Sequence, residues 1–202
     1  MDLIVTIVRH GNTFDAGQQT RRIGARTDLP LVASGRDQAL ALGRSFAEQG
    51  LAFDRALAAP LRRTRATTDA ILASQSRAPV VESVDWLTEI DHGPDEGQIE
   101  SDVEARIGHD ALVAWDKEAC APNGWIVDSD RRIAGWRDLW TTGRGHVLIV
   151  TSNGAARFAL LSDERLRGQA AALPSLKLRT GAYGAIAREQ GGLRLIAWDL
   201  RP

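Results

Sequence analysis

The chain alternates between short apolar runs and longer stretches in which apolar and polar side chains are mixed. Residues 3–8 and 146–151 are short, rich in β-branched side chains and nearly continuous in apolarity. That pattern is typical of strands buried on both faces of a parallel sheet. Weaker patterns of the same kind predict strands at 55–59, 78–82, 176–178, 182–187 and 193–198.

The mixed stretches predict helices. Ser34 followed by Asp37 resembles a capping box, which predicts a helix from there to about Gln49, with Gly50 as its stop. The inner stripe of this helix is formed by Ala39, Leu42, Gly43 and Phe46. Further helices are expected at about 61–74, 100–118 and 129–142, and from about 155 onward. Strands that alternate with helices indicate an α/β layered fold with a mostly parallel sheet.

Composition narrows the classes of protein to consider. The 202 residues include 25 Lys and Arg against 26 Asp and Glu, so a formal net charge of −1 gives no electrostatic reason to expect nucleic acid or a membrane as partner. Cys120 is the single cysteine, which excludes an intrachain disulfide and a cysteine-based zinc site. The first apolar run is too short for a signal peptide or a membrane span, so a cytoplasmic location is expected.

Four tryptophans gather in the central helical part of the chain. They are Trp115, Trp125, Trp136 and Trp140. They can pack the core or a lid, or they can form the apolar wall of a substrate pocket. Nothing in the sequence separates these two interpretations.

Two segments could bind an anion. The first strand ends in Arg9-His10-Gly11-Asn12-Thr13, at the edge of a parallel sheet where ligands bind. A histidine in that place can be a structural hydrogen-bonding group or a catalyst. Arg62 and Arg63 open the helix after the second strand, where free backbone N–H groups and a guanidinium suit phosphate. One of the two arginines is expected on the solvated face.

These segments, in this order, resemble the histidine phosphatase superfamily, the phosphoglycerate mutase-like proteins. The resemblance spans nearly the whole chain. It also includes the stretches 22–31, 87–97 and 177–183, and it closes on 198–202. It implies a single three-layer α/β/α domain over residues 1–202, with a mostly parallel central sheet flanked by helices. Residues from about 90 to 142 would then be a helical insertion or lid over the site.

The resemblance also assigns roles by position. His10 matches the nucleophile that becomes a phosphohistidine, and Arg9 matches its neighbouring phosphate ligand. Arg63, not Arg62, matches the second phosphate arginine, because the family spacing is Pro-Leu-x-Arg. Glu89 matches the proton donor. Arg22 falls where the family places an arginine that reaches toward the substrate, and Thr13, in the first motif, is a further binding residue.

One position departs from the family. A second catalytic histidine is expected just after the late buried strand, in a Ser-His-Gly setting, and here that position is Asn153. His92, His109 and His146 do not fall in this place. The amide of Asn153 can donate a hydrogen bond to a phosphoryl oxygen but cannot carry a positive charge. Loss of one electrostatic donor at such a site reduces the rate by about 10²–10³-fold.

The implied chemistry is phosphoryl transfer without a metal or another cofactor. A neutral His10 would attack phosphorus, with its other ring nitrogen held by a backbone carbonyl, while Arg9 and Arg63 stabilise the equatorial oxygens. Glu89 would give its proton to the leaving oxygen, and a nearby phosphate dianion should raise its pKa.

The resemblance therefore predicts a phosphomonoester hydrolase acting on a small phosphorylated metabolite. Asn153 leaves open a slow phosphatase, a phosphatase for an unusual substrate, or a phospho-ligand binding protein with little or no turnover. A phosphoglycerate mutase fits less well, because the chain is short compared with those mutases and because replacement of the second histidine should hurt a reaction that must keep and return the phosphoryl group. Arg21, Arg22 and Arg26 either bind a further anionic group of the substrate or are solvated surface side chains.

Overall fold

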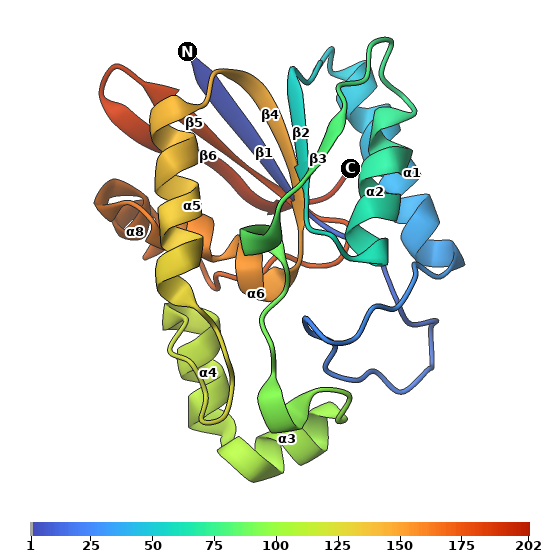
Figure 1. Cartoon of the computed structure of the whole chain (residues 1–202), viewed down its shortest axis with the longest axis vertical. Coiled ribbons are helices and arrows are strands. Elements are labelled where there is room, and N and C mark those ends of the chain that lie inside the picture. The colour runs from blue at the N-terminus through green and yellow to red at the C-terminus, as the bar shows by residue number, and fades with distance from the viewer. Residues whose placement is uncertain (1) are drawn as a thin grey trace.

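A six-stranded mixed sheet forms the centre of the molecule, which is described by a computed structural model over residues 2–202 (Figure 1). Its strands are β1 (Leu3–Arg9), β2 (Arg55–Ala58), β3 (Val81–Ser83), β4 (Gly145–Thr151), β5 (Tyr183–Glu189) and β6 (Gly192–Leu200). They lie in the order β3-β2-β4-β1-β5-β6. The strands from β3 to β1 run parallel, and β5 is antiparallel to both of its neighbours. The mostly parallel α/β fold is thus confirmed.

Helices cover both faces of the sheet, which makes the three layers. On one side lie α1 (Ala33–Glu48) and α2 (Arg62–Leu72), at the right of Figure 1. On the other side lie α5 (Ser129–Thr142), α6 (Asn153–Ala156), α7 (Phe158–Leu161) and α8 (Glu164–Ala170). Among residues 2–202, no helix combines the length and the apolarity needed to cross a bilayer.

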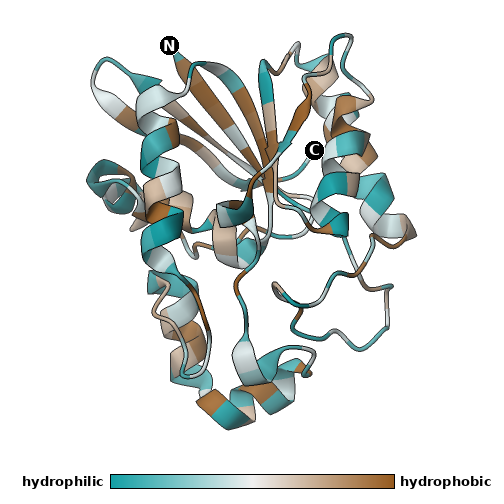
Figure 2. Cartoon of the chain, viewed as in Figure 1, coloured by the Kyte–Doolittle hydropathy of each residue, from teal (hydrophilic) through white to brown (hydrophobic). Residues whose placement is uncertain are grey.

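The central strand β4 explains the continuous apolar runs. Its alternate side chains face opposite layers: Leu148 packs with Phe46 on the α1 and α2 side, while Ile149 packs with Trp136 on the α5 side. A strand buried on both faces needs an apolar side chain at every position, so it shows no alternation in sequence. Figure 2 shows these apolar strands between helices whose outer faces are hydrophilic.

The sequence predicts the C-terminal end of α1 correctly but not its N-terminal end. Gly50 has a φ of +69° and donates its N–H to the carbonyl of Ala47, so the expected stop is confirmed. The capping box is wrong, because the helix begins at Ala33 and its N-cap Val32 has no side-chain cap. Ser34 instead accepts a hydrogen bond from the side chain of Asn12, which ties the helix to the loop after β1.

Four other sequence predictions are corrected. The helix expected at 100–118 is two helices, α3 (Glu100–Ile107) and α4 (His109–Glu118), because Gly108 between them has a φ of +86°. Residues 176–178 form no strand, since the N–H and C=O groups of Leu178 bind side chains instead. The third strand starts at Val81 rather than at residue 78, and the helix after β4 starts at Asn153 rather than at residue 155.

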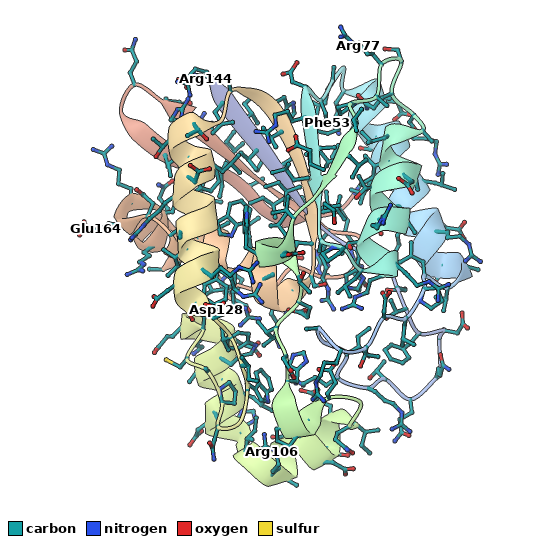
Figure 3. The ribbon with its side chains drawn as sticks, viewed as in Figure 1. Phe53, Arg77, Arg106, Asp128, Arg144 and Glu164 are labelled. Atoms are coloured by element: carbon teal, nitrogen blue, oxygen red, sulfur yellow. The ribbon has the colours of Figure 1, made fainter. Side chains whose placement is uncertain are left out.

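Helices α3 and α4 lie beyond the carboxyl ends of β1, β2 and β4, at the bottom of Figure 1. Short 3-10 turns η1 (Asp85–Leu87) and η2 (Gly93–Asp95) lead to them. Arg106, labelled at the far end in Figure 3, binds the buried carboxylate of Asp95. Asp95 also accepts a hydrogen bond of 2.6 Å from the indole of Trp125. These contacts hold α3 and the segment around Trp125 against η2.

The tryptophans form two separate pairs. Trp136 and Trp140 stack in the core under α5, with ring centroids 5.3 Å apart. Trp115 and Trp125 meet edge to face at 5.4 Å, and Trp115 also lines a cavity at the carboxyl edge of the sheet. Each of the two interpretations of this cluster therefore describes part of it.

Candidate active site

A cavity of about 920 Å³ opens at the carboxyl edge of the parallel strands. Six of the seven site residues predicted from the sequence line it: Arg9, His10, Thr13, Arg22, Glu89 and Asn153. The seventh, Arg63, is fully buried and is hydrogen-bonded to His10. Residues far apart in the chain thus meet because parallel strands end at the same edge.

His10 follows β1 directly and is held from both sides of its ring. Its Nδ1 lies 2.8 Å from the carbonyl oxygen of Gly11, which requires a proton on Nδ1. Its Nε2 then carries a lone pair, which accepts a hydrogen bond of 3.2 Å from Nε of Arg63. Burial, with the charges of Arg63 and Arg9, holds the pKa of His10 well below its usual value of 6.5. The imidazole is therefore neutral at pH 7 with a defined tautomer.

Arg63 lies in the first turn of α2, and backbone carbonyls of the loop after β1 hold its side chain. Its Nη1 donates to the carbonyl of Thr27 at 2.6 Å, and its Nη2 donates to the carbonyl of Gly24 at 3.1 Å. The preceding Arg62 is exposed on the helix surface, as expected for one of the two arginines. The three hydrogen bonds of Arg63 fix its guanidinium against His10.

The backbone of Leu178 positions two further side chains. Its carbonyl accepts a hydrogen bond of 2.7 Å from Nη1 of Arg9, and its N–H donates to Oδ1 of Asn153 at 2.9 Å. Because Oδ1 of Asn153 is occupied as an acceptor, its NH₂ group is left to face the cavity as a donor. Arg9 keeps a buried Nε without a hydrogen-bond partner among residues 2–202.

Glu89 is buried, with 6% of its surface exposed, and among residues 2–202 its carboxylate accepts hydrogen bonds from two backbone N–H groups. Its Oε1 accepts the N–H of Ile90 at 2.9 Å and its Oε2 accepts the N–H of Gly154 at 3.1 Å. A Cβ atom on Gly154 would lie 2.3 Å from Oε1, so this close approach requires glycine. Burial alone would raise the pKa of Glu89, but His92, these two N–H groups and Arg63 bring it below its usual value. Without a phosphate nearby, Glu89 is ionised.

Arg22 and Thr13 come from the long loop between β1 and α1. Arg22 is ion-paired with Glu100 of α3, and its guanidinium lies 4.8 Å from the ring centroid of Trp125. Arg26 pairs with Asp91 at 3.0 Å and lies outside the cavity lining, whereas the exposed Arg21 is part of that lining. Of the three arginines considered from the sequence, Arg21 and Arg22 can therefore reach a bound molecule.

Several residues near the cavity are not predicted from the sequence. Besides Trp115, which the sequence offers as a possible pocket wall, the lining includes His92, Asp116, Lys177, Arg179 and Arg201. Arg157 lies just behind it, fully buried, one helical turn after Asn153. That four-residue spacing was the only signal in the sequence for Arg157. Asp116 comes from α4, where no motif marks it, whereas His92, Lys177, Arg179 and Arg201 lie in stretches of the family resemblance to which the sequence assigned no role for these side chains.

The fold and this arrangement of histidine, arginines and carboxylate define a class of phosphate-handling protein. The chain matches the family description "Histidine phosphatase superfamily (branch 1)" over residues 5–201. It therefore belongs to the histidine phosphatase superfamily.

Curated relatives point to the same family. The chain is 26% identical over 129 residues to a 2,3-bisphosphoglycerate-dependent phosphoglycerate mutase of Borreliella burgdorferi, covering 63% of this chain and 51% of that protein. It is 29% identical over 131 residues to the mutase of Bacteroides fragilis, with the same coverage. The chain thus spans about half the length of the curated relatives that it matches.

Solved structures share the fold over their whole length. A mycobacterial glucosyl-3-phosphoglycerate phosphatase superposes with a TM-score of 0.77 at 19% identity, covering 98% of this chain and 99% of that one. The alpha-ribazole phosphatase from Shigella flexneri superposes with a TM-score of 0.72 at 22% identity, covering 98% and 96%. The mycobacterial phosphatase has also been solved with VO₃ and with inorganic phosphate.

Proposed function

We propose that this protein hydrolyses phosphomonoesters through a phosphohistidine formed on His10. The observation that carries this proposal is the hydrogen bonding of the imidazole: Gly11 holds the proton on Nδ1, so Nε2 keeps a lone pair on a side chain that lines the cavity. A neutral imidazole with a fixed lone pair is a competent nucleophile at pH 7. The carbonyl that was expected to hold the ring is the carbonyl of Gly11.

The first step forms a P–N bond between phosphorus and Nε2 of His10 while the bond from phosphorus to the leaving oxygen breaks. Arg63 can move its Nε–H from Nε2 of His10 to a phosphoryl oxygen, because the lone pair that it binds is consumed in the attack. Arg9, which lines the cavity, supplies a second guanidinium. Fixed charges of this kind stabilise the equatorial oxygens, which is the main requirement of phosphoryl transfer.

Glu89 acts first as the general acid and then as the general base. A bound phosphate dianion disfavours its ionised form and raises its pKa, so the carboxyl can protonate the leaving oxygen. The resulting carboxylate then takes a proton from water as that water attacks phosphorus. The P–N bond breaks in this second step, which restores His10 and releases inorganic phosphate.

Asn153 stands in this proposal where the family has its second histidine. Its NH₂ group would donate a neutral hydrogen bond to the phosphoryl group, and a neutral donor is roughly half as strong as a charged one. We therefore expect slow turnover. Thr13 and Arg22 would contact the substrate farther from phosphorus.

The substrate would be a small phosphorylated metabolite. The similarity to phosphatases for glucosyl-3-phosphoglycerate and alpha-ribazole phosphate supports this size class. We propose a single domain over residues 1–202, in which residues from about 90 to 142 cover the site as a helical insertion or lid. The contact of Trp115 and Asp116 with the cavity supports that arrangement.

A phospho-ligand binding protein is the second candidate. The lowered pKa of Glu89 favours it, because a carboxyl that stays ionised cannot protonate a leaving group. Such a protein would bind phosphate at the same residues without turning over an ester.

One experiment separates the two. Purified protein is given p-nitrophenyl phosphate and, separately, a radiolabelled acyl phosphate, with His10→Ala as the test variant and the exposed Arg62→Ala as the control. Hydrolysis together with an acid-labile, base-stable label, both lost in His10→Ala and kept in Arg62→Ala, supports the hydrolase. Phosphate binding without hydrolysis or label supports the binding protein. A label that persists in His10→Ala would refute the assignment of the nucleophile.

A further inference from the structure

Arg157 is a cation that the protein has buried and only partly neutralised. Its side chain is fully inaccessible, in the turn between α6 and α7. Its Nη1 donates to the carbonyl of Trp115, and its Nε lies 3.5 Å from the carbonyl of Asn153. Its Nη2 has no hydrogen-bond partner among residues 2–202.

The carboxylate nearest to Arg157 is shared with a second cation. Oδ1 of Asp116 lies 3.8 Å from Nη2 of Arg157, which is beyond hydrogen-bond distance. The other oxygen of Asp116 lies 2.5 Å from Nζ of Lys177. One carboxylate therefore faces two cations, and a buried charge without its own partner is costly to the folded state.

Arg157 remains charged under ordinary conditions. Burial lowers its pKa to about 10, while Asp116 and Glu89 raise that pKa and Arg9 and Arg22 lower it. A pKa of about 10 still leaves the guanidinium protonated at pH 7. All four of these charged residues also line the cavity, so the charge of Arg157 interacts with the charges around the site.

The guanidinium lies directly behind the cavity wall. It stacks 4.1 Å from the ring centroid of Trp115, and both Trp115 and Asn153 line the cavity in front of it. Trp115 and Asn153 therefore contact the guanidinium on one side and the cavity on the other. Because the guanidinium is fully buried, its charge is screened less than the charge of an exposed side chain.

We propose that Arg157 is a positioning residue that supplies the positive charge on the Asn153 side of the phosphoryl site. It does so through the wall formed by Asn153 and Trp115 rather than by touching the substrate. Asp116 neutralises Arg157 only in part, because it is also paired with Lys177. A phosphoryl dianion bound at His10 supplies the remaining negative charge. This inference rests on the proposed function, because it assigns a phosphoryl group to the cavity.

The test compares Arg157→Lys, Arg157→Met and the wild type, with Arg44→Met on the exposed face of α1 as a control for the same substitution. Turnover of p-nitrophenyl phosphate and inhibition by orthovanadate are measured, after circular dichroism has shown that each variant is folded. Arg157→Met should lower kcat and vanadate affinity about tenfold, less than the loss of a directly contacting donor. Arg157→Lys should stay within about threefold of the wild type at pH 7, since its charge is retained.

The pH profile of Arg157→Lys distinguishes an electrostatic role of Arg157 from a packing role. It also tests the proposal if Arg157→Met does not fold. A buried lysine loses its proton at a lower pH than a buried arginine. The ratio of Arg157→Lys to wild-type activity should therefore fall as the pH rises above 7. That ratio cancels the titration of groups common to both proteins, including Glu89, Asp116 and Lys177.

A double variant tests whether a new cation at position 153 can compensate for the lost charge of Arg157. Asn153→His places a titratable cation in front of Arg157, so it should raise kcat by a larger factor in the Arg157→Met background than in the wild type. A pH-independent ratio for Arg157→Lys, or folded Arg157→Met with kcat within twofold of the wild type, would overturn the role of Arg157. A wild type that neither hydrolyses the ester nor forms the His10 label would instead overturn the proposed function.

Discussion

Nε of Arg63 lies 3.2 Å from Nε2 of His10, although 53 positions separate the two residues in the chain. The helix start of α2 and the end of β1 are brought together because β2 and β1 flank the same central strand, β4. Arg63 is in turn held by the carbonyls of Gly24 and Thr27, so the loop after β1 orients it. This contact joins the candidate nucleophile to a candidate phosphate ligand before any substrate arrives.

The first prediction concerns the protonation of His10. Because burial, Arg63 and Arg9 lower its pKa well below 6.5, its ring should remain the neutral Nδ1–H tautomer from pH 8 to about pH 6. Nitrogen-15 NMR of the histidine side chains measures this directly. A protonation midpoint for His10 at or above about 6.5 would contradict the prediction.

The same shift has a consequence for stability. The unfolded chain takes up a proton on His10 near pH 6.5, whereas the folded chain does so only at a much lower pH. The free energy of unfolding contributed by His10 should therefore be complete above about pH 6.5 and decrease as the pH falls below it. Urea unfolding of the wild type and of His10→Gln between pH 7.5 and about 5.5 gives the difference.

The second prediction concerns the fork of hydrogen bonds made by Arg63. A lysine keeps the charge but cannot bind Gly24, Thr27 and His10 at the same time. Arg63→Lys should lower kcat/KM about 100-fold and also lower Tm. The neighbouring Arg62→Lys, on the exposed face of α2, is the matched control and should leave both within the error of measurement. Equal effects of the two substitutions would show that Arg63 has no special place in the site.

The third prediction concerns the close approach of Glu89 to Gly154. A methyl group at position 154 would lie 2.3 Å from Oε1 of Glu89 and must displace that carboxylate. Gly154→Ala should therefore lower turnover at least tenfold, as expected when a general acid and base is moved. Gly168→Ala, at an open position in α8, should leave turnover unchanged and raise the free energy of unfolding by up to about 1 kcal/mol. Full activity in Gly154→Ala would remove Glu89 from the mechanism.

The fourth prediction concerns the donor group of Asn153. Asn153→Asp keeps an oxygen for the N–H of Leu178 but replaces the NH₂ group by a charged oxygen. That oxygen repels a phosphoryl dianion, so vanadate affinity and kcat should both fall at least tenfold at pH 7. The fold should be retained, because the contact with Leu178 is preserved. Unchanged vanadate inhibition would mean that residue 153 does not face the phosphoryl group.

Local patterns in the sequence determined the main elements of the fold. The apolar runs at 3–8 and 146–151 are strands β1 and β4 because burial on both faces demands apolar side chains at every position. The position of His10 and Arg63 at element ends follows from the same patterns, and the carboxyl edge of a parallel sheet brings such ends together. These features depend on the spacing of apolar side chains along the sequence and on the direction of the strands.

Contacts between distant segments decided the rest. Leu178 gives its N–H and C=O groups to Asn153 and Arg9 instead of to a strand. Arg157 is bound by Trp115 and Asp116 of α4, and Trp115 is 42 positions away from it in the chain. A backbone group or a charge takes the partners that the folded chain places beside it, and sequence periodicity reports burial but carries no record of those partners.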